Sequence, residues 1–229
     1  MNGYSGEQAC EISICGQTLS LLPERVIWWE RQNTIIISDT HFGKPAHFRK
    51  FGIPIPGTLN DKDITRLRNV ITGTEAKRVI ITGDLFHSEI NREWTAFTDL
   101  LAELRGVSFI LVPGNHDILP DSIYQDAGLQ ITQQSLDDGP FTFIHSTEDA
   151  ALDPDHRFFI GGHIHPMYRI NGKARQSIRI PCFHLTENSL TLPSFGSFTG
   201  GHTIIPGHAE KVYGVTENRV LDLSSINAV

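Results

Sequence analysis

The chain has 229 residues, of which 39% are hydrophobic and 20% charged, and it carries a formal net charge of −7. This composition excludes disordered and collagen-like proteins. No apolar run approaches the roughly 20 residues of a membrane-spanning helix, and the first residues lack the pattern of a secretory signal. Three cysteines without a C-x-x-C pair favour a reducing compartment, so we expect a cytoplasmic protein that makes no contact with a membrane.

The first part of the chain is predicted to alternate strands with helices. Short runs of β-branched and apolar residues predict buried strands at 34–37, 78–82 and 107–112. Between them, residues 59–71 and 94–104 carry apolar side chains at helical spacing. The predicted order is therefore β-α-β-α-β.

The second part is predicted to form mainly antiparallel sheet. Glycines punctuate six strand candidates, at 141–144, 157–160, 177–180, 189–192, 202–205 and 211–215. No linker, repeat or charge block divides the chain, so we expect one domain over residues 1–229. The predicted fold class is α/β (α+β), with two packed mixed β-sheets flanked by helices.

A polar residue able to bind a metal follows each of five consecutive predicted strands. In chain order these residues are Asp39 and His41, Asp84, Asn115 with His116 and Asp117, His145, and His163 with His165. Loops at the carboxyl ends of strands converge on one crevice, where ligands bind in open α/β sheets. Neighbouring glycines let the chain turn sharply there. Five of the 11 histidines belong to this set, which makes it the main explanation of the histidine surplus.

Carboxylate oxygen and imidazole nitrogen together suit borderline divalent ions. Seven candidate ligands are too many for one tetrahedral ion but suffice for two ions that share a carboxylate: Asp39, His41, Asp84, Asn115, His145, His163 and His165. Paired ions about 3.5–4 Å apart clamp the attacking and leaving oxygens in phosphatases and nucleases. We expect two divalent ions, with manganese first and iron, zinc, cobalt and nickel as alternatives.

Each position also has a simpler explanation when it is taken alone. Asp84 could cap a helix, residues 114–117 could form an ordinary turn, and His163 and His165 could lie at a solvated hairpin tip. All of these explanations would have to hold together at successive strand ends. A single dimetal site is the simpler hypothesis.

The ordered motifs D-x-H, G-D, G-N-H-D, H and G-H-x-H over residues 39–165 resemble those of the calcineurin-like metallophosphoesterases. The resemblance implies the four-layer metallo-dependent phosphatase fold. It also implies that Asp39, His41 and His165 bind the first ion and that Asp84 bridges. Asn115, His145 and His163 would complete the second site. His116 matches the family's catalytic histidine, with Asp117 placed to orient it.

A narrower resemblance to the bacterial DNA-ligase-associated metallophosphoesterases runs nearly end to end. Four of the segments that carry it are 28–30, 83–88, 163–166 and 192–201. That family is regarded as a DNA-repair nuclease encoded near a ligase and a helicase. The resemblance implies a DNA substrate and association with such a repair system. The residues after Asp84 and His116 depart from the pattern of protein Ser/Thr phosphatases, which argues against that activity.

The predicted chemistry is hydrolysis of a phosphodiester by attack of a hydroxide formed on the metal ions, with His116 protonating the leaving oxygen. A basic cluster that could contact the phosphate backbone or be a solvated loop is formed by Lys44, His47, Arg49 and Lys50, of which the first three are the candidate substrate contacts. His87 could line the substrate cleft. Two alternatives stay open: a phosphohydrolase of small or cyclic nucleotides, and a non-catalytic scaffold.

Overall fold

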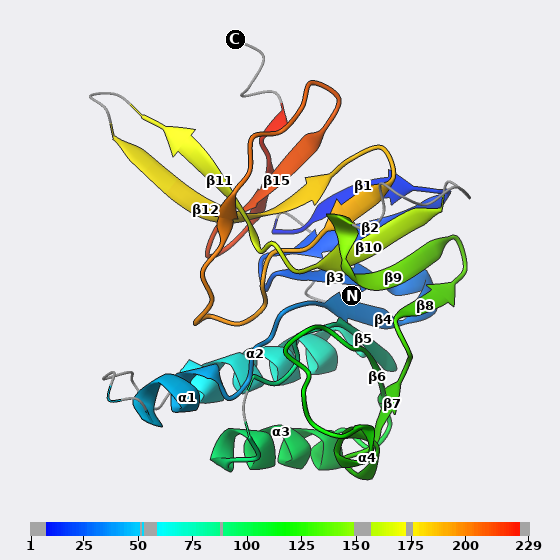
Figure 1. Cartoon of the computed structure of the whole chain (residues 1–229). Helices are drawn as coiled ribbons and strands as arrows, with labels where there is room; N and C mark the ends of the chain where they lie inside the picture. Colours follow the sequence, from blue (N-terminus) through cyan, green and yellow to red (C-terminus); the bar gives the residue numbers. More distant parts are fainter. Residues whose placement is uncertain are drawn as a thin grey trace.

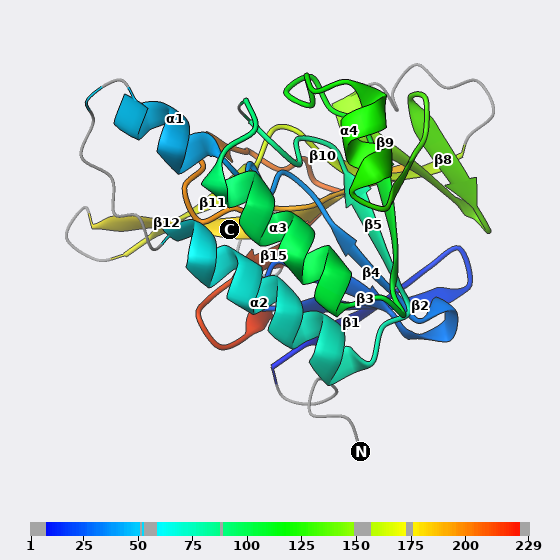
Figure 2. The same cartoon turned by 90° about the horizontal axis from the view of Figure 1, so that it is seen from below.

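Two β-sheets lie face to face in the computed structural model, and its four α-helices cover the outer side of the first sheet (Figures 1 and 2). The structure describes residues 8–50, 52, 59–87, 89–148, 157–172 and 176–224. None of the helices within these ranges has both the length and the apolar character needed to cross a membrane.

The first sheet joins an antiparallel half to a parallel half. In spatial order, its described strands are β1 (Cys10–Ile14), β2 (Gln17–Leu22), β3 (Val26–Trp29), β4 (Thr34–Ile37), β5 (Arg78–Thr82), β6 (Ser108–Val112) and β7 (Leu129–Ile131). Strands β4 to β7 are parallel. Ile37 pairs with Ile81, and Thr82 pairs with Val112, so the carboxyl ends of β4, β5 and β6 lie at one edge.

The helices bury apolar stripes against this sheet. They are α1 (Lys44–Lys50), α2 (Leu59–Thr74), α3 (Arg92–Glu103) and α4 (Asp121–Asp126), with a 3-10 turn, η1, at Glu30–Gln32. Asn91 caps α3, because its side chain accepts hydrogen bonds from the backbone N–H groups of Glu93 and Trp94. Leu67 of α2 and Phe97 of α3 are fully buried in the core beneath the sheet.

The second sheet is mixed as well. Its described strands are β8 (Ser135–Asp138), β9 (Phe141–Ser146), β10 (Phe158–Gly162), β11 (Pro166–Asn171), β12 (Ser177–Leu185), β13 (Ser189–Thr191), β14 (His202–Thr203), β15 (Lys211–Val215) and β16 (Val220–Asp222). Strand β10 runs parallel to both β9 and β13, while β12 is antiparallel to β11, β13 and β15. The carboxyl ends of β9 and β10 therefore also lie side by side.

Apolar side chains from both sheets fill the space between them. Ile36 and Ile80 of the first sheet belong to the same buried cluster as Phe143 and Ile160 of the second. All four are fully excluded from solvent. Because this core locks the sheets together, it fixes the strand ends of one sheet relative to those of the other.

The structure confirms two packed mixed sheets flanked by helices, and each predicted strand overlaps an observed one. It corrects two points. Strands β7 and β8 lie between β6 and β9, so the five polar strand ends do not follow five consecutive strands. The four described helices lie on the first sheet, and among the described residues none lies on the outer side of the second sheet, where the four-layer fold implies one (Figure 1). Several connections there are short hairpins, which leave no room for a crossover helix.

Candidate metal centre

Five strand ends from the two sheets meet at one place. The backbone N–H of Asp39, after β4, donates to the carbonyl oxygen of Gly83 after β5. His163, after β10, donates its N–H to Oδ2 of Asp39 over 3.0 Å. His145 of β9 places Nδ1 3.1 Å from the carbonyl oxygen of Thr82. The first bond joins two strand ends of the first sheet, and the other two cross to the second sheet, so the ends are joined into one site.

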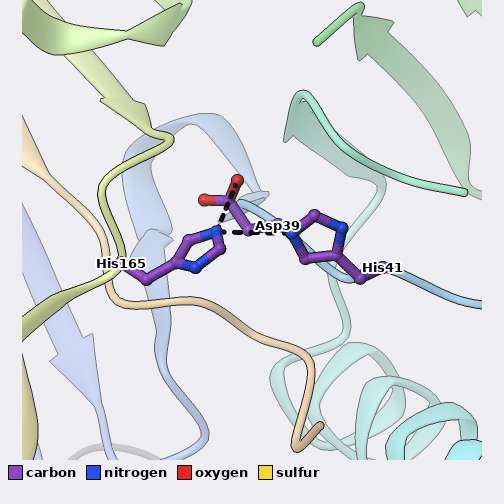
Figure 3. A group of neighbouring side chains, drawn as sticks. All are labelled: Asp39, His41 and His165. Carbon is purple, nitrogen blue, oxygen red and sulfur yellow. Dashed lines mark hydrogen bonds and ion pairs between the residues drawn. The ribbon is translucent and has the colours of Figure 1, made fainter. Parts of the chain in front are cut away.

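Asp39, His41 and His165 form a first group of possible metal ligands (Figure 3). His165 Nε2 lies 3.1 Å from Asp39 Oδ1 and 3.3 Å from His41 Nε2. Asp84 Oδ2 lies 3.7 Å from His41 Nε2. One ligand atom from each of Asp39, His41 and His165 thus lies within 4.8 Å of the other two, and Asp39 also forms such a group with Asp84 and His145.

His145 is the centre of a second group. Its Nε2 lies 3.0 Å from Asn115 Oδ1, 3.0 Å from His163 Nδ1 and 3.5 Å from Asp84 Oδ1. Asp84 therefore presents one carboxylate oxygen to each group. That placement suits the bridging role which the family resemblance implies.

Most of the separations between these atoms fit divalent ions. Ligand atoms that share an ion at about 2.1 Å lie about 3.0–3.4 Å apart for angles between octahedral and tetrahedral values, and the distances of 3.0–3.3 Å given above fall in this range. The carbonyl oxygens of Thr82 and Gly200 can only accept hydrogen bonds, so they place protons on Nδ1 of His145 and of His165. The lone pairs on Nε2 of both histidines then point into the groups, as metal ligation requires.

The surroundings of the Asp39 carboxylate also fit a bound cation. Its Oδ2 accepts hydrogen bonds from Ser38 Oγ, over 2.6 Å, and from the N–H of His163. Its Oδ1 is buried, and among the described residues no donor satisfies it with hydrogen-bond geometry. A buried carboxylate oxygen without a donor is costly unless a cation meets it.

The electrostatics keep the ligands in their metal-binding protonation states. Burial acts to raise the pKa of Asp39, but the facing His165 and the Ser38 hydroxyl outweigh it, so this pKa lies below its ordinary value. Burial, with the nearby charge of Lys44, lowers the pKa of His41 to about 2. The carboxylate is therefore charged and the imidazole neutral at pH 7.

Five of the ligand candidates hold their own backbones in the left-handed region. Their φ angles are 53° at Asp39, 46° at His41, 52° at Asp84, 77° at His163 and 49° at His165. Such a conformation costs of the order of 1–3 kcal/mol at a residue with a side chain. We predicted that glycines would make the turns at these strand ends, and Gly83 has a positive φ as well. The ligands themselves, however, carry most of the strain.

His116 and His87 stack at the edge of the site. Their ring centroids lie 4.1 Å apart, and the His116 ring lies 5.6 Å from that of His41. The backbone N–H of His116 donates to Asp84 Oδ1 over 2.9 Å. The structure therefore brings both histidines beside the two ligand groups.

Asp117 has a different set of partners from the one that the resemblance implies. Its Oδ1 accepts from the N–H groups of Leu85 and Phe86, and its Oδ2 accepts from that of Gly114. Burial raises the pKa of this carboxyl to about 6. Asp117 thus ties the loop after β5 to the loop after β6. No contact between its side chain and the His116 ring is found among the described residues.

The predicted basic cluster lies on a helix and not on a loop. Lys44 begins α1 close enough to Asp84 and Asp39 for their charges to act on it, although burial has the larger effect and lowers its pKa. Arg49 donates to Glu93 Oε1 of α3 over 2.6 Å. The side chain of His47 lies outside the part of the chain that the structure describes.

Two polar features of the site were not predicted. The Ser38 hydroxyl bonds to Asp39, and the carbonyl oxygen of Gly200 orients His165. Ser38 stands at the end of a buried strand, where a polar residue is a usable signal. Gly200 contributes only a backbone oxygen, so its residue type does not indicate a role in the site.

Comparison with known proteins agrees with this geometry. A model of the calcineurin-like phosphoesterase family matches residues 33–184. The crystal structure of Pseudomonas putida nuclease MPE has a TM-score of 0.77 and 25% sequence identity, covering 94% of this chain and all of that chain. A protein of unknown function from Aquifex aeolicus has a TM-score of 0.43 and 16% identity, covering 62% of this chain and 82% of that one. No curated protein matches the chain significantly.

Proposed function

Because this chain belongs to the calcineurin-like phosphoesterase family, and is therefore a metal-dependent phosphoesterase, we propose that it is a dimetal phosphodiesterase that cleaves DNA. The observation that carries the proposal is the placement of Asp84. One of its oxygens faces His41 and the other faces His145, so two sets of ligand atoms share one carboxylate.

The proposed ligand set follows the two groups. Asp39, His41 and His165 would hold the first ion, and Asn115, His145 and His163 the second, with Asp84 between them. The mixture of oxygen and nitrogen donors suits manganese, and iron, zinc, cobalt and nickel are the alternatives. When bound, the ions supply a nucleophile at neutral pH and neutralise phosphate charge.

His116 is the proposed general acid. A phosphodiester leaves as an alkoxide, which needs a proton, and proton donation by a placed side chain contributes about 10²- to 10⁴-fold in rate. The hydrogen bond from its N–H to Asp84 keeps His116 beside the ligands. His87, stacked on His116, would line the substrate cleft.

DNA is the proposed substrate because the Pseudomonas putida protein is named a nuclease and matches over its whole length. Lys44 is the proposed contact for a phosphate next to the cleaved one, since it lies close enough to Asp39 and Asp84 for their charges to act on it. The net charge of −7 does not oppose this proposal, because two divalent ions add four positive charges at the site. The narrower family resemblance supports a role in DNA repair with a ligase and a helicase.

The test compares substrates with manganese present. We expect hydrolysis of bis-p-nitrophenyl phosphate to exceed that of p-nitrophenyl phosphate, and we expect DNA to be cleaved. His116→Ala should lower DNA cleavage by about 10²- to 10⁴-fold. The control is His208→Ala, which replaces an exposed histidine outside the two ligand groups and should keep wild-type rates.

Three outcomes would overturn the proposal. A preference for the monoester would exclude a phosphodiesterase, and full activity of His116→Ala would exclude the general acid. Hydrolysis of the small diester without cleavage of single- or double-stranded DNA would replace DNA by a small nucleotide as the substrate.

A further inference from the structure

The segment at residues 192–201, which the narrower family resemblance includes, has been given no role so far apart from the contact of the Gly200 carbonyl oxygen with His165. Part of it, residues 194–200, wraps around the end of β4 and is called here the clamp loop. Phe195 donates its N–H to the carbonyl oxygen of Ser38 over 2.9 Å. The carbonyl oxygen of Asp39 accepts from Gly196 N–H over 3.1 Å and from Ser194 Oγ over 2.8 Å.

The clamp loop also holds a second ligand of the same group. The carbonyl oxygen of Gly200 lies 3.2 Å from His165 Nδ1 and turns Nε2 toward Asp39. The loop therefore contacts two of the three first-group ligands, and it does so through atoms that do not face the ions. Asp39 needs such support, because its positive φ persists only where the surroundings fix it.

Packing against β4 leaves no space for a side chain at Gly196. A Cβ atom there would lie 2.4 Å from the carbonyl oxygen of Thr40. The approach between the loop and the first ligand strand is therefore at backbone distance. Thr199 closes the loop on itself, since its Oγ1 lies 2.7 Å from the carbonyl oxygen of Gly196 and 2.6 Å from Ser194 Oγ.

Asp63 of α2 anchors the clamp loop from the other side. It is 4% exposed, and its two oxygens accept from Ser197 N–H over 2.8 Å and from Ser197 Oγ over 2.5 Å. Arg66, one turn along α2, pairs with Asp63 over 3.0 Å and donates to the carbonyl oxygen of Phe195. Its guanidinium lies 4.2 Å from the centre of the Phe195 ring.

We propose that Asp63 is a positioning residue for the first metal site and acts through the clamp loop on Asp39 and His165. The inference rests on the proposed metal centre. Asp63 contacts neither ligand directly, so its effect on the ions must pass through the clamp loop, which it reaches through Ser197 and through Arg66. Residues that orient metal ligands typically contribute 10- to 100-fold in metal affinity.

The experiment is a calorimetric titration of metal-free protein with Mn²⁺. We expect Asp63→Asn to lower the affinity for one of the two Mn²⁺ ions by about 10- to 100-fold and to change the affinity for the other by less than about twofold. Ser194→Ala, which removes the hydroxyl group that donates to the carbonyl oxygen of Asp39, should lower the affinity for the same ion. This variant tests the proposal if Asp63→Asn does not fold. The matched control is Asp138→Asn, which breaks a part-buried ion pair with Arg78 at the opposite edge of the first sheet.

A double-mutant cycle identifies the route. With His165→Ala already present, Asp63→Asn should change the affinity of the remaining ion by less than about twofold, because the first site is already impaired. Unchanged affinities in folded Asp63→Asn and Ser194→Ala would overturn the proposal, as would equal weakening of both ions. Wild-type protein that binds fewer than two ions would instead refute the metal centre itself.

Discussion

Strained backbone and close packing concentrate on the residues proposed to bind metal. Asp39 combines a positive φ with a carboxylate whose Oδ2 is fixed by Ser38 and His163. Its Oδ1 is left to face His41 and His165. One oxygen is thus fixed by hydrogen bonds, and the other stays available for the proposed ion. This division would let a single carboxylate be held tightly and still bind an ion.

Gly162 allows the chain after β10 to approach this carboxylate. A Cβ atom at Gly162 would lie 1.9 Å from Ser38 Oγ and 2.1 Å from Asp39 Oδ2. We predict that Gly162→Ala displaces the Asp39 carboxylate and lowers Mn²⁺ affinity by about tenfold or more, measured by titration. Gly106→Ala is the control, since nothing lies within 4 Å of its added Cβ. Equal Mn²⁺ affinity in the two variants would show that the carboxylate adapts.

At the scale of residues, the sequence predicted which side chains meet. A single polar residue after a buried apolar run can cap a helix or lie in a turn, but the repetition of such residues at several strand ends predicted that Asp39, Asp84 and His145 lie together, and the structure brings them together. The contacts of Asp117 were not predictable in the same way. They are made to three backbone N–H groups, and backbone donors carry no sequence signal.

Among the elements, α1 begins with Lys44, which places a positive charge at the edge of the site. The helix was not predicted from the sequence, because seven residues with a proline in the first turn show little apolar periodicity. The antiparallel strands β1 and β2 were also not predicted, although Ile12 and Ile14 alternate with polar residues. In contrast, the long apolar faces of α2 and α3 made both helices predictable.

The ion pair between Arg49 of α1 and Glu93 of α3 indicates that Arg49 stabilises the fold, whereas Lys44 is the proposed DNA contact. The Glu93 side chain is 8% exposed, so loss of Arg49 leaves a nearly buried carboxylate without its partner. We predict that Arg49→Ala lowers the free energy of unfolding by about 1–3 kcal/mol, measured in urea. Lys44→Ala should instead raise the KM for DNA more than that for bis-p-nitrophenyl phosphate.

Glu93→Gln is the matched variant for this prediction. If the ion pair is structural, Glu93→Gln lowers stability as Arg49→Ala does, and neither alters the preference for DNA over the small diester. If Arg49 contacts DNA, as its place in the basic cluster first suggested, Arg49→Ala alone reduces that preference.

At the scale of the whole molecule, the site depends on the packing of two sheets. Strands β4 and β5 and strands β9 and β10 supply ligands from opposite sides of one apolar core. The sequence predicted two packed sheets, but it did not predict which residues of one sheet contact which residues of the other. Asp39 and His163, for example, are separated by 124 residues, and local patterns cannot specify such distant pairs.

Bound ions should therefore stabilise the fold as a whole. A ligand at 100 times its Kd that binds only the folded chain adds about 2.7 kcal/mol, which corresponds to roughly 5–10 °C in Tm for a chain of this size. We predict that a chelator lowers the Tm and that Mn²⁺ restores it, measured by calorimetry. In His165→Ala, Mn²⁺ should raise the Tm by less than it does in the wild-type protein. A Tm that Mn²⁺ does not move in wild-type protein would argue against ion binding by the folded chain.

The most direct test of the dimetal phosphodiesterase is the hydrolysis of bis-p-nitrophenyl phosphate by chelator-treated protein as Mn²⁺ is added back. The two ligand groups that share Asp84 predict no turnover before the metal is added and a maximum rate at two ions per chain. Turnover without metal, or a maximum rate at one ion per chain, would contradict the account.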